Sequence, residues 1–135
     1  MALLQISEPG KSTMPHEHRL AVGIDLGTTN SLIASVVSGA VSILEQGNKE
    51  RLLPSVVNYS SSNPIVGSEA KNLQIKDPKN TISSVKRLIG KNLSDIDTKF
   101  YSLDLKDDDG VIGIQTDQGI KNPVEVSSEI LKKLK

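Results

Sequence analysis

The stretch Gly23-Ile24-Asp25-Leu26-Gly27-Thr28-Thr29-Asn30 joins two runs of β-forming residues and decides how the chain is interpreted. Before the turn, apolar residues alternate with small or acidic ones, which places Asp25 on the strand face that has only small neighbours. After the turn, residues 32–37 resume a β-rich run. The pattern therefore predicts a hairpin that reverses the chain at residues 27–30.

The predicted turn has the chemistry of an anion-binding loop. Its backbone N–H groups and the hydroxyls of Thr28 and Thr29 can surround phosphate oxygens, and Asp25 offers an oxygen ligand to a hydrated magnesium ion. The alternative is an ordinary hairpin in which Gly27 and Asn30 occupy turn positions and the aspartate caps its own turn. Taken by itself, the turn favours the ordinary hairpin.

Composition excludes several classes of protein. The chain has the length of one domain, 135 residues, and its 16 basic side chains balance 16 acidic ones, so no general field attracts nucleic acid or an anionic membrane. The absence of cysteine excludes disulfides, thiolate catalysis and cysteine-held clusters, and fits a cytoplasmic protein. Two tyrosines and one phenylalanine are too few for a base-stacking surface. No run is apolar enough for a signal peptide or membrane span, and P-loop, Rossmann, nucleophile-elbow and H-E-x-x-H motifs are missing.

The first half of the chain reads as an extension followed by strands and a short helix. Residues 1–18 are predicted to be a flexible extension whose two histidines are solvated rather than metal ligands. Strands are expected at 40–44, around 52–59 and at 65–66. Ser68 is the expected N-cap of a helix running to about residue 75. A capping box and the helix dipole would then favour an acidic residue at position 71, so Lys71 breaks a local rule. This indicates either a functional site at Lys71 or a lysine that points into solvent.

The second half is predicted to contain two helices and a hairpin. A helix is expected at 81–89, with Lys86 and Arg87 in its last turn, either as dipole complement on a solvated face or lining a cleft. The run 107–110 fits a hairpin turn better than a calcium loop, because the glutamate and spaced ligands of such a loop are missing. Asn122-Pro123 opens a final helix with an apolar stripe. Since no later segment could cover that stripe, we expect the chain to be part of a longer protein, truncated inside this helix.

The motif resembles the first phosphate loop of the heat-shock protein 70 chaperones, within the actin and sugar-kinase ATPase superfamily. Further segments resemble the family in the right order, so that residues 19–135 are covered: Asn48–Ser55, Val66–Asn72, Asn80–Gly90 and Pro123–Leu131. The extension Met1–Gly10 and the run Arg51–Ser55 resemble the branch dedicated to bacterial iron–sulfur cluster assembly. The segments after residue 47 disfavour a sugar kinase.

The resemblance implies a site for ATP or ADP with magnesium. It implies that Asp25 holds magnesium through water and that Gly27 belongs to the phosphate loop. It further implies that Thr28 faces the γ-phosphate and that Thr29 with Asn30 holds the β-phosphate. Lys71 is expected to reach the γ-phosphate and help to position the attacking water.

The implied fold is α/β, an incomplete ribonuclease-H-like, actin-type ATPase lobe: a β-meander with the phosphate hairpin plus a small α+β subdomain. Residues 19–135 would be the first part of a nucleotide-binding domain, with the second phosphate loop, adenosine pocket and peptide-binding domain beyond them. The implied function is ATP-driven release of a client peptide, with an iron–sulfur scaffold protein as client and a J-domain co-chaperone. The alternative is that the chain alone is an inactive piece or a non-catalytic binding module.

Overall fold

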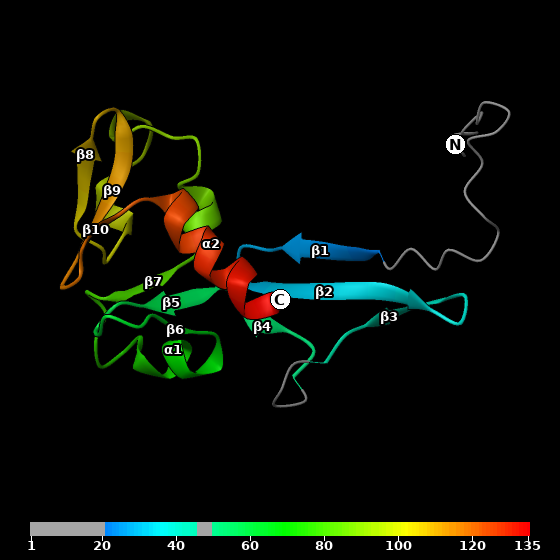
Figure 1. The fold of residues 1–135 in the computed structure, drawn as a ribbon. Helices are drawn as coiled ribbons and strands as arrows, with labels where there is room; N and C mark the ends of the chain where they lie inside the picture. Colours follow the sequence, from blue (N-terminus) through cyan, green and yellow to red (C-terminus); the bar gives the residue numbers. More distant parts are fainter. Residues whose placement is uncertain (1–20, 46–49) are drawn as a thin grey trace, which may run out of the picture.

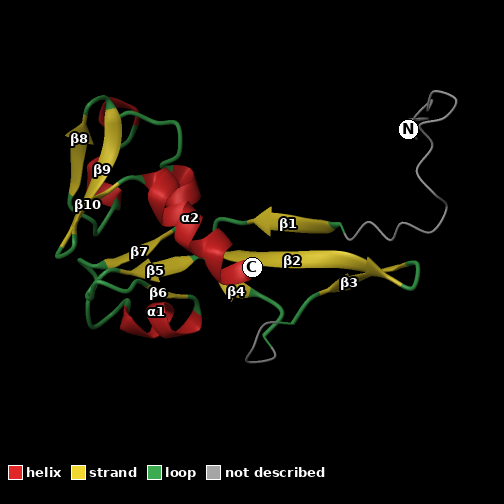
Figure 2. Ribbon diagram, viewed as in Figure 1, coloured by secondary structure: helices red, strands yellow, loops and turns green. Residues whose placement is uncertain are grey.

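The computed structural model describes residues 21–45 and 50–135 (Figure 1). The expected extension 1–18, with its histidines, lies outside these residues. The described part contains helices and sheets, in line with the expected α/β class, and the strand pairings within it are antiparallel. Figure 2 shows the sheets in yellow and the helices in red.

Within the described residues the strands form three small sheets. The first has the order β1 (Val22–Leu26), β2 (Asn30–Val37) and β3 (Ala40–Ile43), and β4 (Leu53–Pro54) also pairs with β2. The second has the order β6 (Ile65–Val66), β5 (Val56–Asn58) and β7 (Thr81–Ser83). The third has the order β10 (Gly119–Lys121), β9 (Val111–Thr116) and β8 (Leu105–Asp108).

The predicted first hairpin is confirmed. Residues of β1 and β2 pair from Val22 opposite Ser35 to Leu26 opposite Ser31, so the chain reverses over the three residues between the strands. A second turn leads from β2 into β3, as the sequence predicted. In Figure 1 these strands form a long arm that extends away from the rest of the molecule.

The predicted helix at 81–89 is wrong. Residues 81–83 form β7, in which Ile82 lies opposite Val57 of β5. Ser84 has a left-handed backbone, with φ of 54°, which a continuous α-helix does not allow. Only a 3-10 turn, η1 (Val85–Arg87), follows it. The β-branched pair at the start of this segment therefore joins a neighbouring strand rather than starting a helix.

The short helix α1 (Ser68–Leu73) begins differently from the prediction. Gly67 occupies the N-cap position, and the Ser68 hydroxyl makes no cap bond but donates to the Glu50 carboxylate at 2.9 and 3.1 Å. The helix has six residues, and Lys71 lies in its last turn, where a cation is favourable to the dipole. Lys71 therefore breaks no local rule, and the prediction that it does is wrong, because it depended on Ser68 being the N-cap.

The third sheet contains the predicted turn at residues 107–110. The Asp107 carboxylate accepts a hydrogen bond from the Gly110 N–H at 2.8 Å, as expected of a polar turn. The strand before the turn is β8, which begins at Leu105. Two 3-10 turns, η2 (Leu93–Asp95) and η3 (Thr98–Phe100), occupy the preceding segment.

The last helix, α2 (Pro123–Leu134), starts as predicted. The Asn122 side chain accepts a hydrogen bond from the Glu125 N–H at 2.8 Å and caps the helix. Both α1 and α2 contact β5, and Figure 1 shows them on opposite sides of the β6-β5-β7 sheet. Of the apolar stripe of α2, Val126, Ile130 and Leu134 are buried by earlier parts of the chain, whereas Leu131 is 37% exposed.

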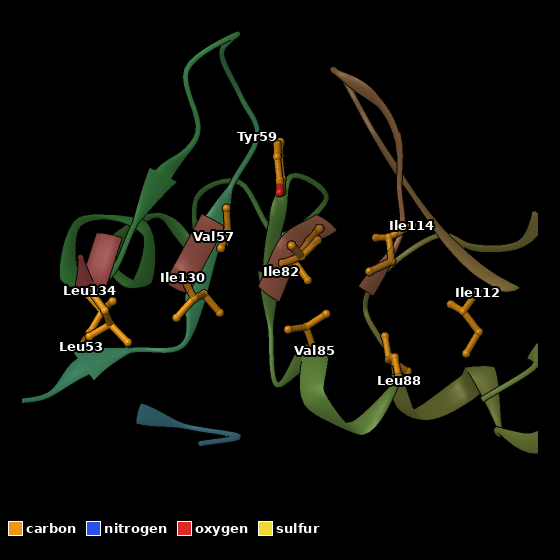
Figure 3. Close-up of a cluster of buried hydrophobic side chains, with 11 residues drawn as sticks. Leu53, Val57, Tyr59, Ile82, Val85, Leu88, Ile112, Ile114, Ile130 and Leu134 are labelled. Carbon is orange, nitrogen blue, oxygen red and sulfur yellow. The ribbon is translucent and has the colours of Figure 1, made fainter. Parts of the chain in front are cut away.

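One core unites these elements (Figure 3). It lies between α2, the second sheet, η1 and the third sheet. Its buried members are Leu53, Val57, Tyr59, Ile82, Val85, Leu88, Ile112, Ile114, Val126, Ile130 and Leu134. Leu53 belongs to β4, which pairs with β2 directly after the first turn. The core thereby fixes the first sheet, which contains the turn at residues 27–30.

Candidate functional site

The turn after β1 is compact because it contains glycine. A Cβ atom placed on Gly27 would collide with the carbonyl oxygen of Asn30. The chain can reverse this tightly only where no side chain intervenes. The geometry of the turn therefore requires a glycine at position 27, the position that resembles a glycine of the family's phosphate loop.

Ser55 ties this turn to the body of the protein. Its hydroxyl donates to the Gly27 carbonyl at 2.8 Å, and its N–H donates to the Thr29 carbonyl at 2.8 Å. The Ser31 and Ser55 hydroxyl oxygens lie 2.9 Å apart in a buried hydrogen bond. The turn is therefore fixed from one side by a residue between β4 and β5.

A cavity of about 160 Å³ lies beside the turn. Its lining brings the turn together with α1 and with the segment after β7. The lining residues are Thr28, Thr29, Ser55, Val56, Lys71, Gln74, Ser83 and Ser84. Hydroxyl and ammonium groups of this kind donate hydrogen bonds, so the lining suits an anion with several oxygen acceptors.

Three of the predicted site residues meet in this cavity, and three do not line it. Thr28, Thr29 and Lys71 are brought together, although α1 is distant from the turn in sequence. Gly27, Asn30 and Asp25 lie in the adjoining turn and strand. Gly27 is held by Ser55, whereas Asn30 and Asp25 are exposed.

Asp25 lies on β1 opposite Leu32, just before the turn. Its carboxylate makes no side-chain hydrogen bond or ion pair with the residues that the structure describes. The described residues also contain no group of three or more potential metal ligands. A magnesium ion here would have to take most of its ligands from water and phosphate, which is how this ion is commonly bound. The Asp25 carboxylate, which has no partner among the described residues, fits that arrangement.

Lys71 is exposed at the rim of the cavity, and its backbone is well fixed. The Lys71 N–H donates to the Gly67 carbonyl, and the Gly67 N–H donates to the Val56 carbonyl, both at 3.0 Å. Gly67 has φ of 91°, and a Cβ atom there would lie 2.6 Å from Leu53 Cδ1. No ion pair within the described residues occupies the lysine.

Sequence reasoning missed the other polar residues of the cavity. Ser83 lies in β7 opposite Val56, a pairing that no local sequence pattern predicts. The Gln74 amide donates to the Ser83 hydroxyl at 3.2 Å. Lys86 and Arg87 are exposed on η1, directly after this segment. Arg87 lines a neighbouring cavity of about 230 Å³. Lys86 is therefore a second cation close in sequence to the cavity wall.

Three side chains away from the cavity have shifted pKa values. Burial, together with Glu125 and Glu129, raises the pKa of Tyr59. Hydrogen bonds from Lys79 and then Asn80 lower the pKa of Asp117, and the same contact raises the pKa of Lys79. The Lys79–Asp117 pair is solvent-exposed at 2.7 Å, so it contributes little stability.

No helix among the described residues is long and apolar enough to cross a membrane.

Comparison with known proteins places these features in a family. The family model described as "Hsp70 protein" matches residues 21–135. Relatives named "Chaperone protein HscA homolog" include one from Colwellia psychrerythraea, 57% identical over 136 residues, which covers 99% of this chain and 22% of the relative. Those from Pasteurella multocida and Methylobacillus flagellatus are each 56% identical over 137 residues, with 99% and 100% of this chain covered and 22% of each relative.

The chain thus spans about a fifth of the length of these relatives, at 22%. The alignments cover nearly all of this chain. They therefore include amino-terminal residues from which the sequence predicted the iron–sulfur branch.

Proposed function

Because the chain belongs to the heat-shock protein 70 family, in its HscA-type branch, we propose that it forms one wall of the ATP site of a molecular chaperone. The observation that carries the proposal is the cavity in which Thr28 and Thr29 of the turn meet Lys71 of α1. Hydroxyls, turn N–H groups and an ammonium group are the donors that bind phosphate oxygens.

The size of the cavity limits what this wall receives. Pockets for whole small molecules commonly enclose about 300–1,000 Å³. The cavity here encloses about 160 Å³, which suits phosphate groups rather than a complete nucleotide. The adenosine part would be bound by residues outside this chain, which covers 22% of the length of its relative from Colwellia psychrerythraea. The fold we propose for the complete domain is of the ribonuclease-H-like, actin type.

Each predicted residue has a role in this proposal. Thr28 faces the γ-phosphate, and Thr29 with Asn30 holds the β-phosphate, largely through backbone N–H groups. Gly27 permits the tight turn. Asp25 orients water on a magnesium ion, and the ion neutralises phosphate charge when bound.

Lys71 is proposed to stabilise charge that develops on the γ-phosphate. Its support is its place in the cavity and its lack of an ion pair within the described residues. Lys86 is the competing cation, since it follows Ser83 and Ser84 of the same cavity wall. The two lysines are exposed, so replacing either is expected to leave the fold intact.

A comparison of Lys71→Ala and Lys86→Ala in the complete protein tests this role. Nucleotide binding by calorimetry and single-turnover ATP hydrolysis are measured for both variants. Lys71→Ala is expected to keep nucleotide binding and to lower hydrolysis by about a hundredfold. Lys86→Ala is expected to retain most of the hydrolysis. The reverse result would assign the catalytic cation to Lys86 and overturn the role of Lys71.

The role of Asp25 is tested by a magnesium titration. Asp25→Asn removes the charge with little change in shape, so half-maximal hydrolysis should require more magnesium than in the unmodified protein. An unaltered titration curve would contradict the assignment.

At the level of the whole protein, we propose that ATP binding and hydrolysis change the affinity for a client peptide. The client class is an iron–sulfur scaffold protein in the cytoplasm, with a J-domain co-chaperone as second partner. Fluorescence anisotropy of a labelled scaffold peptide should show faster release after ATP is added. If ATP leaves release unchanged although it binds, the alternative of a non-catalytic binding module is favoured.

A further inference from the structure

We propose that Ser55 is the positioning residue of the phosphate turn. The inference rests on the proposed function, because it concerns how the turn presents its donors to phosphate. Ser55 donates its hydroxyl to the Gly27 carbonyl and its N–H to the Thr29 carbonyl, each at 2.8 Å. One residue therefore holds two of the carbonyl groups of the turn.

Holding these carbonyls also orients N–H groups. A peptide unit is planar and trans, so its C=O and N–H bonds point in opposite directions. The Gly27 carbonyl shares a peptide unit with the Thr28 N–H, and the Thr29 carbonyl shares one with the Asn30 N–H. Both N–H groups consequently point away from Ser55 in fixed directions. They are donors that the proposed function assigns to phosphate.

The hydroxyls behind the turn form a chain with a defined direction. The Ser55 hydroxyl has one proton, and it is used on the Gly27 carbonyl. In the 2.9 Å contact between the two serines, Ser31 must therefore be the donor and Ser55 the acceptor. Ser31 is 1% and Ser55 2% exposed, so water does not compete with these bonds. Such a buried chain is stiff, since each bond polarises the next.

The residue after Ser55 holds the opposite wall of the cavity. The Val56 carbonyl accepts from the Gly67 N–H at 3.0 Å, and the Gly67 carbonyl accepts from the Lys71 N–H at 3.0 Å. The adjacent residues Ser55 and Val56 thus fix the turn and α1 relative to each other. Loosening Ser55 should change the phosphate-binding geometry while the core, which does not contain this residue, remains packed.

The test is Ser55→Ala in the complete protein, with Ser127→Ala as control. Ser127 is also a buried serine that donates to a backbone carbonyl, that of Pro123 at 2.7 Å, but it lies on α2 away from the cavity. Affinities for magnesium-ATP and for adenosine are measured by calorimetry. Ser55→Ala should weaken ATP binding about tenfold and leave adenosine binding unchanged, because only the phosphates use the turn. Ser127→Ala should change neither affinity.

The outcomes separate this inference from the function on which it rests. If the unmodified protein does not bind magnesium-ATP, the proposed function itself fails. If the unmodified protein binds but Ser55→Ala binds ATP equally well, only the positioning role is overturned. A proportionate loss of ATP and adenosine affinity would reduce Ser55 to general stability and also overturn it. Ser31→Ala, which leaves the Ser55–Gly27 bond in place, should weaken ATP binding less than Ser55→Ala; an equal or larger loss would contradict the direction of the hydroxyl chain.

Discussion

Replacing Gly27 with alanine should damage the phosphate turn, whereas the same change at Gly23 should not. Both glycines belong to the strand and turn that resemble the phosphate loop. A Cβ atom on Gly23 has no atom within 4 Å, while one on Gly27 would collide with the Asn30 carbonyl oxygen. The two substitutions are chemically identical, so any difference between them reports the geometry of the turn.

The expected cost follows from the contacts that must change. Relieving the Gly27 collision displaces the turn, and overpacking of this kind costs about 1–3 kcal/mol. The displacement also strains the bonds from Ser55 to the Gly27 and Thr29 carbonyls, each worth about 0.5–1.5 kcal/mol. We expect Gly27→Ala to lower the free energy of unfolding by about 2–4 kcal/mol. Gly23→Ala should be neutral or stabilising by less than about 1 kcal/mol.

Urea unfolding of the two variants and the unmodified chain measures this difference. The midpoints should separate while the slopes stay alike, since the exposed surface on unfolding does not change. In the complete protein, Gly27→Ala should also weaken magnesium-ATP binding, and Gly23→Ala should not. Equal unfolding free energies for the two variants would refute the close approach between Gly27 and Asn30.

Three further changes test the core, a buried hydroxyl and the start of α1. Ile130→Ala in the core should lower the free energy of unfolding in urea by about 2–5 kcal/mol. Val124→Ala, at a site on the same helix that is 64% exposed, should lower it by less than about 0.5 kcal/mol. Similar losses for the two variants would contradict the packing of α2. Tyr59→Phe removes a buried hydroxyl without a hydrogen-bond partner in the described structure, so it should stabilise the chain by up to about 1 kcal/mol at pH 7. Burial and two glutamates of α2 raise the pKa of Tyr59 in the folded chain. The unmodified chain should therefore lose stability above about pH 10, where the tyrosine of the unfolded chain ionises, and the phenylalanine variant should lose less. Parallel profiles of stability against pH for the two chains would contradict this. Gly67→Ala should cost more than about 1 kcal/mol, because φ is 91° and the new Cβ would lie 2.6 Å from Leu53 Cδ1; a neutral effect in thermal unfolding would argue against this start of α1.

The sequence predicted those elements whose causes are local. The turns after β1 and β2 and the hairpin at residues 107–110 are marked by glycine and polar residues between β-rich runs. The start of α2 is marked by Asn122 and Pro123, which supply a cap and a preset backbone angle. Neighbouring residues suffice to determine such features.

The failures arose where a distant partner decides the structure. Ile82 was assigned to a helix because its spacing from later apolar residues suits one, but pairing with Val57 makes it part of a sheet. Ser55 belongs to two segments that resemble the family, but no role at the turn was predicted for it, since its partners Gly27 and Thr29 lie far away along the chain. Lys71 illustrates a mixed case. Its predicted role remains a proposal, but the capping argument for it was wrong.

The central claim is that this chain supplies one phosphate-binding wall of a nucleotide site. Calorimetric titration of magnesium-ATP into the 135-residue chain and into the complete protein tests it most directly. We expect saturable, tight binding by the complete protein and heats indistinguishable from dilution for the chain alone. Tight binding by the isolated chain, or no binding by the complete protein, would contradict the account.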